Sequence, residues 1–281
     1  MNDTDDWFEV TRFGPGSHQI SEGRGVLQCN SFVLSAEDET LLLDTGLGIG
    51  NLPAVVDELA SGDVSVLLSH AHWDHIGHAH SFDDVRIHES EWPADSILTI
   101  DSMTDEFVDR PEQFVRGWLD SGKSFPESFD PERYAIRPTP DVRPIDEGET
   151  VTVGDRELEL LPIPGHSPGQ LAVLDRHERV CYAADVLEPG WKVYAHFAHS
   201  DVEAYRDSVA RLRAAWNEGA FDTLALSHGD AIQGEDLELL TETLKALNAI
   251  IAEELDHERV DTPWGPVSEY ETSTVRILTS P

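Results

Sequence analysis

The sequence predicts an α/β protein organised as a four-layered sandwich, helix–sheet–sheet–helix. Two observations indicate this fold class: strand-like apolar runs alternate with amphipathic helical runs, and this cycle occurs twice along the chain. A length of 281 residues with 40% hydrophobic content is enough for one large core. We therefore expect a single domain over residues 1–281.

The first half of the chain supplies strands followed by a helix. Asn51 stands where a helix cap is expected and Pro53 falls in the first turn of that helix. The run that follows the helix is short and apolar, as in a buried strand, and it stops where a group of histidines begins. The expected elements are strands at 26–35 and 40–44, a helix at 51–61 and a strand at 64–69.

The second half repeats the pattern after an irregular stretch. Residues 89–140 mix helical pieces with turn-forming residues and lack the apolar content for a core of their own, so we expect an insertion over one edge of the core. A Gly-Asp pair at 154–155 predicts a hairpin. The further elements expected are strands at 169–175, 179–185 and 223–228, a helix at 201–216 and a C-terminal helical segment at about 234–257.

The charge balance is extreme, with 55 acidic and 19 basic residues and a net charge of −36. The acidic residues are spread over every segment, which indicates a solvated acidic surface rather than a local binding patch. Only three residues are lysine, a depletion that resembles proteins of salt-accumulating halophiles. In molar salt the Debye length falls to about 3 Å, which would screen the self-repulsion of this chain.

The sequence features that relate to cellular location indicate a cytoplasmic protein. The start of the chain has no basic segment followed by an apolar one, so no signal peptide is expected. No apolar run approaches the roughly 18 residues of a membrane span. Cys29 and Cys181, the two cysteines, lie far apart in strand-like contexts and do not form a disulfide framework.

Five histidines fall within the fourteen residues 67–80, LLSHAHWDHIGHAH. Such a density indicates a metal site, a proton relay or an artificial tag, and a tag does not fit mid-chain. In extended backbone His70 and His72 would share one face and hold one ion. A turn would bring Asp74 and His75 to a neighbouring position, and this ligand set suits zinc, iron or manganese.

Three further candidate ligands follow strand-like runs. His166 lies in the turn of PIPGHSPG, Asp185 ends CYAAD and His228 ends LALSH. A carboxylate at the end of an apolar run is costly unless it is paired or bound to a metal. Each residue taken alone is a weak signal, but loops at strand ends are where rigid scaffolds carry chemistry.

In this order the motifs resemble those of the metallo-β-lactamase superfamily, over about residues 32–228. The resemblance implies that His70, His72 and His166 hold one metal ion, that Asp74, His75 and His228 hold the other, and that Asp185 bridges both. Asp74 and Asp185 would count as catalytic residues, and Asp44 in LLLDTG would orient a ligand histidine or its loop. His78 and His80 fall outside the pattern, so we expect them on a helix surface.

The resemblance implies a hydrolase with two divalent ions, most simply Zn²⁺ with Mn²⁺ or iron as alternatives, and a bridging hydroxide as nucleophile. The motifs look closest to the thioesterase and lactonase branches, which favours a small acyl substrate with an ester, thioester or lactone bond. Tyr194 and His199 are candidate proton donors or substrate contacts. Aromatic residues of the insertion and of the segment 188–201 are equally suited to forming an acyl pocket and to packing.

Two other functions use the same motifs. A nuclease related to transfer-RNA 3′ processing enzymes would make a nucleic acid the partner, but the chain has no basic cluster to bind RNA. A di-iron redox or binding module is the third alternative, and no flavin-binding domain accompanies the motifs. A serine hydrolase is disfavoured because no G-x-S-x-G nucleophile elbow is found: the letters match only at GHSPG, in the turn that carries His166.

Overall fold

The computed structural model describes residues 7–23, 26–146, 148–262 and 265–281. The chain divides into two compact units: the first comprises Met1–Asp146 and Thr152–Arg156, and the second comprises Glu147–Val151 and Glu157–Pro281. Residues 1–6, which carry most of the sequence on which the signal-peptide expectation rests, lie outside the described residues. Whether the two units form the single domain that the sequence predicts stays a prediction.

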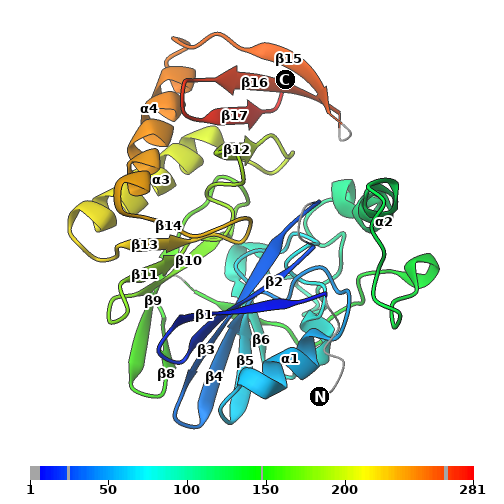
Figure 1. Ribbon diagram of the computed structural model, residues 1–281. Helices are drawn as coiled ribbons and strands as arrows, with labels where there is room; N and C mark the ends of the chain where they lie inside the picture. Colours follow the sequence, from blue (N-terminus) through cyan, green and yellow to red (C-terminus); the bar gives the residue numbers. More distant parts are fainter. Residues whose placement is uncertain (1–6, 24–25, 147, 263–264) are drawn as a thin grey trace. The chain divides into compact units, whose positions relative to one another are not determined.

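The first unit is built on a seven-stranded sheet in which the strands follow one another in chain order, β1 to β7 (Figure 1, blue to green). Pairing is antiparallel from β1 to β4 and parallel from β4 to β7. The strands are β1 Glu9–Gly14, β2 Ser17–Glu22, β3 Cys29–Ala36, β4 Glu39–Leu43, β5 Asp63–Leu67, β6 Val85–His88 and β7 Arg143–Ile145.

The local elements predicted for the first half are confirmed. Strands β3, β4 and β5 fall on the three expected runs, and helix α1 (Leu52–Leu59) follows β4. Asn51 is the N-cap of α1, with its side-chain oxygen accepting a hydrogen bond from the Ala54 amide at 3.3 Å. The hairpin β1–β2 was not predicted, because β1 is exposed and mostly polar and shows no apolar stripe.

The parallel pairing of β4 with β5 fixes the geometry of the ligand loops in this unit. Leu43 pairs with Leu67, so the chain leaves both strands at the same edge of the sheet. Asp44 follows β4 directly, and its amide donates to the Leu67 carbonyl at 3.1 Å. The loop after β4 and the histidine loop after β5 therefore lie side by side.

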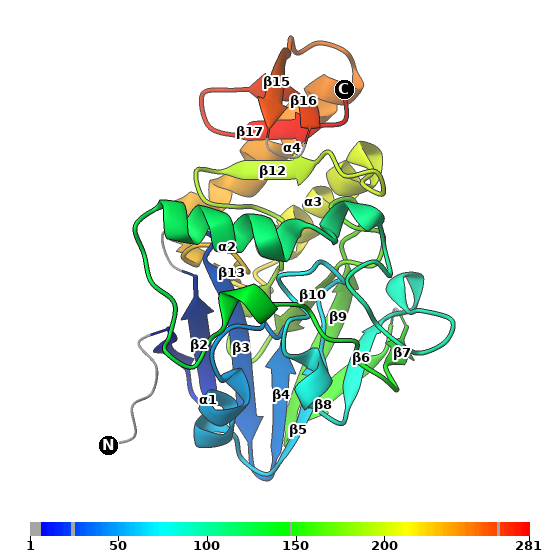
Figure 2. The same cartoon turned by 90° about the vertical axis from the view of Figure 1, so that its right-hand side faces the viewer.

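The segment 89–140 contains the helix α2 (Arg110–Asp120) and three short 3₁₀ helices, η2 Glu89–Glu91, η3 Asp105–Phe107 and η4 Pro131–Arg133. Helix α2 lies beyond the end of the sheet at which β4 finishes (Figure 2). Its Trp118 packs against Trp7 with ring centroids 4.9 Å apart, and Phe114 lies 6.0 Å from Trp73. These aromatic residues of the insertion therefore pack against the rest of the first unit.

A six-stranded sheet in the order β14-β13-β11-β10-β9-β8 belongs mostly to the second unit, with residues 152–156 of β8, β9 and the turn between them assigned to the first unit (Figure 1). The predicted hairpin corresponds to β8 and β9, which are neighbours in this sheet, and the three predicted strands correspond to β10, β11 and β13. The strands are β8 Thr150–Val153, β9 Arg156–Pro162, β10 Leu171–Asp175, β11 Val180–Tyr182, β13 Thr223–Ala225 and β14 Ile232–Gln233. Strand β11 pairs in parallel with β13, so both strands end at one edge.

The helices α3 (Val202–Asn217) and α4 (Leu239–Ile251) pack together in the second unit, and a short helix η5 (Gly234–Glu238) precedes α4. A further four-stranded sheet, in the order β12-β17-β16-β15, was not predicted. It consists of β12 Lys192–Ala195, β15 Glu258–Thr262, β16 Gly265–Glu271 and β17 Arg276–Thr279. Strand β17 pairs in parallel with β12. The chain continues from β12 into the segment that supports His166. Among the described residues, no helix is both long and apolar enough to span a membrane.

Candidate metal centre

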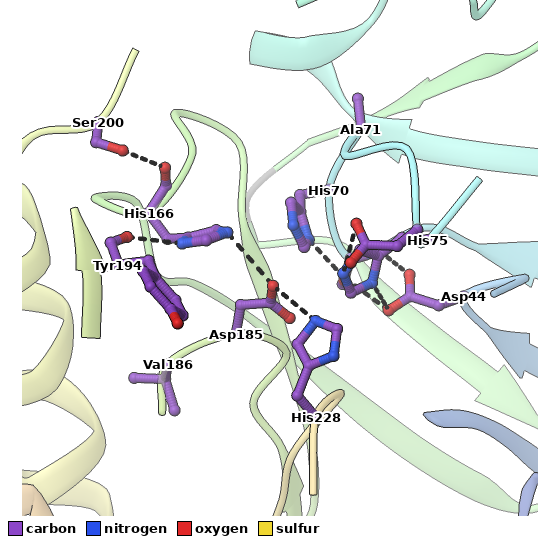
Figure 3. A network of polar contacts seen from close by, with 12 residues as sticks. Asp44, His70, Ala71, His75, His166, Asp185, Val186, Tyr194, Ser200 and His228 are labelled. Atoms are coloured by element: carbon purple, nitrogen blue, oxygen red, sulfur yellow. Dashed lines mark hydrogen bonds and ion pairs between the residues drawn. The ribbon is translucent and has the colours of Figure 1, made fainter. Parts of the chain in front are cut away.

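Asp44 organises the ligand loop of the first unit. It has a positive φ of 59°, which a short polar side chain tolerates better than most, and its carboxylate points at the histidine loop (Figure 3). The carboxylate accepts hydrogen bonds from the Ser69 amide at 2.7 Å, from Ser69 Oγ at 2.8 Å and from His75 Nδ1 at 2.9 Å. Both oxygens of Asp44 are therefore used as acceptors.

These hydrogen bonds set the tautomers of two histidines. His75 donates its Nδ1 proton to Asp44, so in the neutral ring Nε2 carries a lone pair. Ser69 uses its hydroxyl proton on Asp44 and therefore accepts from His70 Nδ1, 2.9 Å away. One carboxylate thus leaves Nε2 of both His70 and His75 as electron-pair donors, the arrangement that metal-binding histidines require.

The three histidines of this loop are buried and lie against one another. The ring of His70 lies 4.4 Å from that of His72 and 4.1 Å from that of His75. Backbone hydrogen bonds hold the loop, since the Thr45 amide donates to the His75 carbonyl at 2.7 Å. Gly77 fits against Gly48 so closely that a Cβ on Gly77 would come within 2.1 Å of the Gly48 amide nitrogen. The loop is therefore tightly constrained.

The donor set of the first unit fits a divalent cation. His75 Nε2, which carries a lone pair, faces Asp74 Oδ1 at 3.8 Å. Two electron-pair donors at this distance repel each other unless a cation or a proton lies between them. Imidazole nitrogens with a carboxylate are the ligands that zinc and related metals prefer. His70, His72, Asp74 and His75 are therefore among the residues that could hold a metal ion.

In the second unit Asp185 lies between two histidines (Figure 3). Its Oδ2 is 3.4 Å from His166 Nε2 and 3.2 Å from His228 Nε2, and all three side chains are buried. His166 donates from Nδ1 to the Tyr194 carbonyl at 2.8 Å, so its Nε2 faces Asp185 with a lone pair in the neutral ring. Burial lowers the pKa of His166, but the hydrogen bond and charge of Asp185, together with Glu188 and the Tyr194 carbonyl, outweigh burial and raise the pKa overall.

The backbone around these ligands is held from several elements. His166 follows β9, Asp185 follows β11 and His228 follows β13. Ser200 Oγ donates to the His166 carbonyl at 2.8 Å, and the Tyr205 hydroxyl of α3 donates to the Asp185 carbonyl at 2.8 Å. Gly165 has a φ of 134°, and a Cβ there would come within 2.3 Å of the Tyr205 Cα. Helix α3 therefore supports both the His166 turn and Asp185.

The two candidate proton donors lie in the segment that supports His166. Burial raises the pKa of the Tyr194 phenol, with Glu188 adding to the shift, so the hydroxyl keeps its proton at neutral pH. Burial lowers the pKa of His199 to about 4, and the charge of His166 adds to this shift. His199 is therefore a neutral imidazole at neutral pH, with its ring stacked on Phe197 at 5.7 Å.

The expectation that His78 is a helix-surface residue is wrong. His78 is buried, and its Nε2 lies 3.4 Å from the Ile49 carbonyl. Burial lowers its pKa to about 4. The loop 76–78 packs under the loop after β4, and this tertiary contact buries a histidine that the sequence pattern left outside the ligand set. His80, in the short helix η1 (Ala79–Ser81), is half-buried.

Two buried carboxylates behind the first ligand set were not predicted. Glu91 accepts a hydrogen bond from the Ala71 amide, between His70 and His72, at 2.5 Å. Glu22 accepts from the Trp7 indole and from the Leu47 amide, both at 2.7 Å. Burial raises the pKa of Glu22 to about 8. Neither residue stands in a motif, and in a chain with 55 acidic residues nothing local distinguishes them from surface carboxylates.

The sequence model of the metallo-beta-lactamase superfamily matches residues 24–215. The chain belongs to this superfamily. The matched region includes all the proposed ligands except His228. The resemblance seen in the motifs is therefore confirmed, and with it the assignment to a superfamily of metallohydrolases.

Relatives and solved structures agree with this assignment. The chain is 25% identical over 247 residues to an acyl-coenzyme A thioesterase, MBLAC2, of Gallus gallus, covering 83% of this chain and 84% of the relative. It is 26% identical over 182 residues to the hydroxyacylglutathione hydrolase GloC of Haemophilus influenzae, covering 64% of this chain and 76% of the relative. A metallo-beta-lactamase family protein of Thermus thermophilus superimposes with a TM-score of 0.61 at 24% identity, over 85% of this chain and 82% of that one. The α/β fold class and the metallo-β-lactamase fold are thereby confirmed.

Proposed function

We propose that this protein is a hydrolase of acyl thioesters that works with two divalent metal ions. The observation that carries the proposal is the orientation of the histidines. His75 in the first unit and His166 in the second each direct Nδ1 to an oxygen acceptor and Nε2 to a candidate carboxylate ligand. This is the arrangement of metal-binding imidazoles with their supporting acceptors. Two divalent ions would lower the pKa of a water molecule and polarise the carbonyl under attack.

The assignment of ligands follows the order of the superfamily motifs along the chain. One ion would take His70, His72 and His166, and the other would take Asp74, His75 and His228. Asp185 would contact both, which agrees with its position between His166 and His228 in the second unit. Zinc is the metal that this nitrogen-rich set favours, with manganese or iron as alternatives.

The protein's own residues would orient the ligands and handle the proton of the leaving group. Asp44 fixes the rings of His70 and His75 through the hydrogen bonds described above. Tyr194 is the better candidate for donating a hydrogen bond to a leaving thiolate, because its hydroxyl stays protonated at neutral pH. His199 carries no extra proton to give at that pH, because its pKa lies at about 4.

The choice of a thioester rests on the relatives. The MBLAC2 relative is an acyl-coenzyme A thioesterase, and the GloC relative is a hydroxyacylglutathione hydrolase. Two aromatic rings stand beside proposed ligands, Phe107 at 4.4 Å from the His72 ring and Phe197 at 5.4 Å from the His166 ring. We propose that Phe197, which is partly exposed, contacts the acyl group, whereas the buried rings of Phe107, Phe114 and Trp118 serve packing within the first unit.

A substrate panel on zinc-loaded and manganese-loaded protein in molar KCl tests this proposal. The panel contains acyl-coenzyme A, acyl glutathione, an uncharged acyl thioester, a lactone and labelled RNA. We expect thioester hydrolysis that disappears with chelator and returns with metal. Cleavage of RNA without hydrolysis of any acyl substrate would instead identify the chain as a nuclease.

Salt dependence sharpens the same experiment. Coenzyme A carries phosphates and this chain carries a net charge of −36, so in dilute buffer the two repel each other. We expect KM for acyl-coenzyme A to fall as KCl rises, with a much smaller change for the uncharged thioester. An equal response of both substrates would mean that salt acts on the fold and not on the encounter with substrate.

A further inference from the structure

A cysteine lies beside one of the proposed metal ligands within the first unit. Cys29 is the first residue of β3 and only 2% exposed, and Asp74 belongs to the histidine loop. Their potential ligand atoms, Cys29 Sγ and a carboxylate oxygen of Asp74, lie within 4.8 Å of each other. Zinc–sulfur and zinc–oxygen bonds of about 2.3 and 2.1 Å place two ligands of one ion at most about 4.4 Å apart, so a separation within 4.8 Å brings the two groups close to the range in which they can share a cation.

The surroundings of Cys29 are acidic. Its direct partner across the antiparallel β2–β3 pair is Glu22, which is also buried. The Tyr134 hydroxyl donates a hydrogen bond to the Leu47 carbonyl, and Leu47 is the residue whose amide binds Glu22. Burial raises the pKa of Tyr134, and the charges of Glu22, Cys29 and Asp74 raise it further. Four groups that each become negative on losing a proton therefore lie within electrostatic reach of one another.

Ionising several of these buried acids together is costly without a cation, and Glu22 and Tyr134 avoid that cost by keeping their protons, as their raised pKa values indicate. Arg110 of α2 supplies one positive charge near Asp74, but burial lowers its pKa to about 10, which shows that this environment is a poor one for the guanidinium. A divalent ion at Asp74 would offset the carboxylate and the thiolate together. The electrostatics and the distance between Cys29 and Asp74 thus both favour a cation beside these two residues.

Cys181, the second cysteine, shows what a packing cysteine looks like in this protein. It lies in the middle of β11 with no exposed surface and belongs to the apolar core of the second unit. Burial raises the pKa of its thiol strongly. The two buried thiols differ in that Cys29 lies beside the Asp74 carboxylate, a proposed metal ligand, whereas Cys181 lies in the apolar core, where the charge of Glu159 adds to the rise of its pKa.

We propose that Cys29 is an additional ligand, through Sγ, of the metal ion that Asp74 holds. This inference rests on the proposed function, which supplies the metal ions. The thiol would release its proton to solvent as the ion binds, because the thiolate is the ligand form. A sulfur ligand would favour zinc, cobalt or iron over manganese and magnesium at this position.

Cobalt substitution tests the proposal by a readout independent of activity. We expect Co²⁺-loaded wild-type protein to show a near-ultraviolet absorption band from thiolate-to-cobalt charge transfer. Cys29→Ser should lose the band, and Cys181→Ala, the matched control, should keep it. Loss of the band only in Cys181→Ala, or its absence from fully loaded wild-type protein, would overturn the proposal.

A second measurement needs no variant and so does not depend on the folding of Cys29→Ser. X-ray absorption of the zinc-loaded wild-type protein should show a sulfur neighbour at about 2.3 Å. A fit with nitrogen and oxygen neighbours alone would disprove the sulfur ligand. In that case two bound ions with acyl hydrolysis would leave the proposed function standing, whereas a chain that binds no metal would contradict both.

Metal preference gives a third outcome. If sulfur contributes, Cys29→Ser should shift the ratio of zinc to manganese affinity towards manganese by roughly tenfold or more, the scale on which groups that support a metal act. Cys181→Ala should leave the ratio unchanged. An unchanged ratio in Cys29→Ser would show that the thiol does not contact the ion.

Discussion

The two units supply proposed metal ligands in opposite ways. In the first unit four ligands fall within six consecutive residues, His70 to His75, on one loop after β5. In the second unit three ligands come from three separate strand ends, between 166 and 228. The loop of the first unit needs one buried carboxylate, Asp44, to orient two rings. The second unit instead relies on Asp185, which itself lies between the histidines that it brings together.

This difference indicates where each unit is vulnerable. A change at Asp44 alters the orientation of histidines but leaves the proposed ligand atoms in place. A change at Asp185 removes an atom proposed to contact both ions. The comparison therefore predicts that losses in the second unit are larger and affect both ions, whereas losses at Asp44 are smaller and concern its own histidines.

Replacement of Asp185 should have the largest effect. Asp185→Asn keeps the volume but removes the negative charge, so both metal affinity and turnover should fall, with turnover lower by on the order of 10²-fold. Metal content and thioester hydrolysis measure this. Asp222→Asn, an exposed carboxylate paired with Arg179 in the same unit, is the matched control and should change little. Full activity with full metal content in Asp185→Asn would refute the bridging role.

Replacement of Asp44 should have the next largest effect. Both oxygens of Asp44 accept hydrogen bonds, so the amide nitrogen of Asp44→Asn must face a donor in either orientation. We expect roughly 10–100-fold weaker binding of metal, with His70 and His75 less well oriented. Titration calorimetry on metal-free protein measures this, with exposed Asp57→Asn of α1 as control. Equal losses for Asp44→Asn and Asp185→Asn would remove the distinction between the two units.

Acid should destabilise the protein through His78 of the first unit. Its pKa is about 4 in the folded chain against 6.5 for an unperturbed histidine, so the folded state disfavours protonation. Its contribution to stability is complete above pH 6.5 and is lost as the pH falls towards 4, by at most about 3 kcal/mol. Denaturant unfolding of metal-free protein between pH 7 and 4 should show a shallower decline in His78→Gln.

The corresponding residue of the second unit serves as a comparison. The pKa of His199 is also about 4, but this side chain is more exposed than His78, so His199→Gln should flatten the pH dependence less. If His199→Gln had the larger effect, the assignment of the main acid-sensitive group to the first unit would be wrong.

Replacement of two glycines should have the smallest effect. Gly77→Ala would place a Cβ 2.1 Å from the Gly48 nitrogen in the first unit, and Gly165→Ala would place one 2.3 Å from the Tyr205 Cα in the second. Each should lower the free energy of unfolding by about 1–3 kcal/mol. Gly117→Ala in α2 meets nothing within 4 Å and should raise it by about 0.5–1 kcal/mol. Stability of Gly77→Ala or Gly165→Ala at the wild-type level would show that the corresponding loop relaxes freely.

The sequence determined the elements whose signals are local. The apolar runs predicted β3, β4, β5 and α1 because burial on a regular element leaves a periodic pattern. The histidine loop was visible because its ligands are adjacent in the chain. His166, Asp185 and His228 were weak signals one by one and gained weight only through the order of the superfamily motifs.

The tertiary structure decided what no local pattern encodes. The strands of the C-terminal sheet alternate charged and apolar residues irregularly, and the pairing of β17 with β12 joins segments more than 80 residues apart. Strand pairing brings Glu22 opposite Cys29, and loop packing buries His78 and brings Asp74 beside the Cys29 thiol. A carboxylate, a thiol or an imidazole has the same letter in the sequence whether it is solvated or buried. Its pKa and its ability to bind a metal depend on which distant residues exclude water from it and which charged or hydrogen-bonding groups they place beside it.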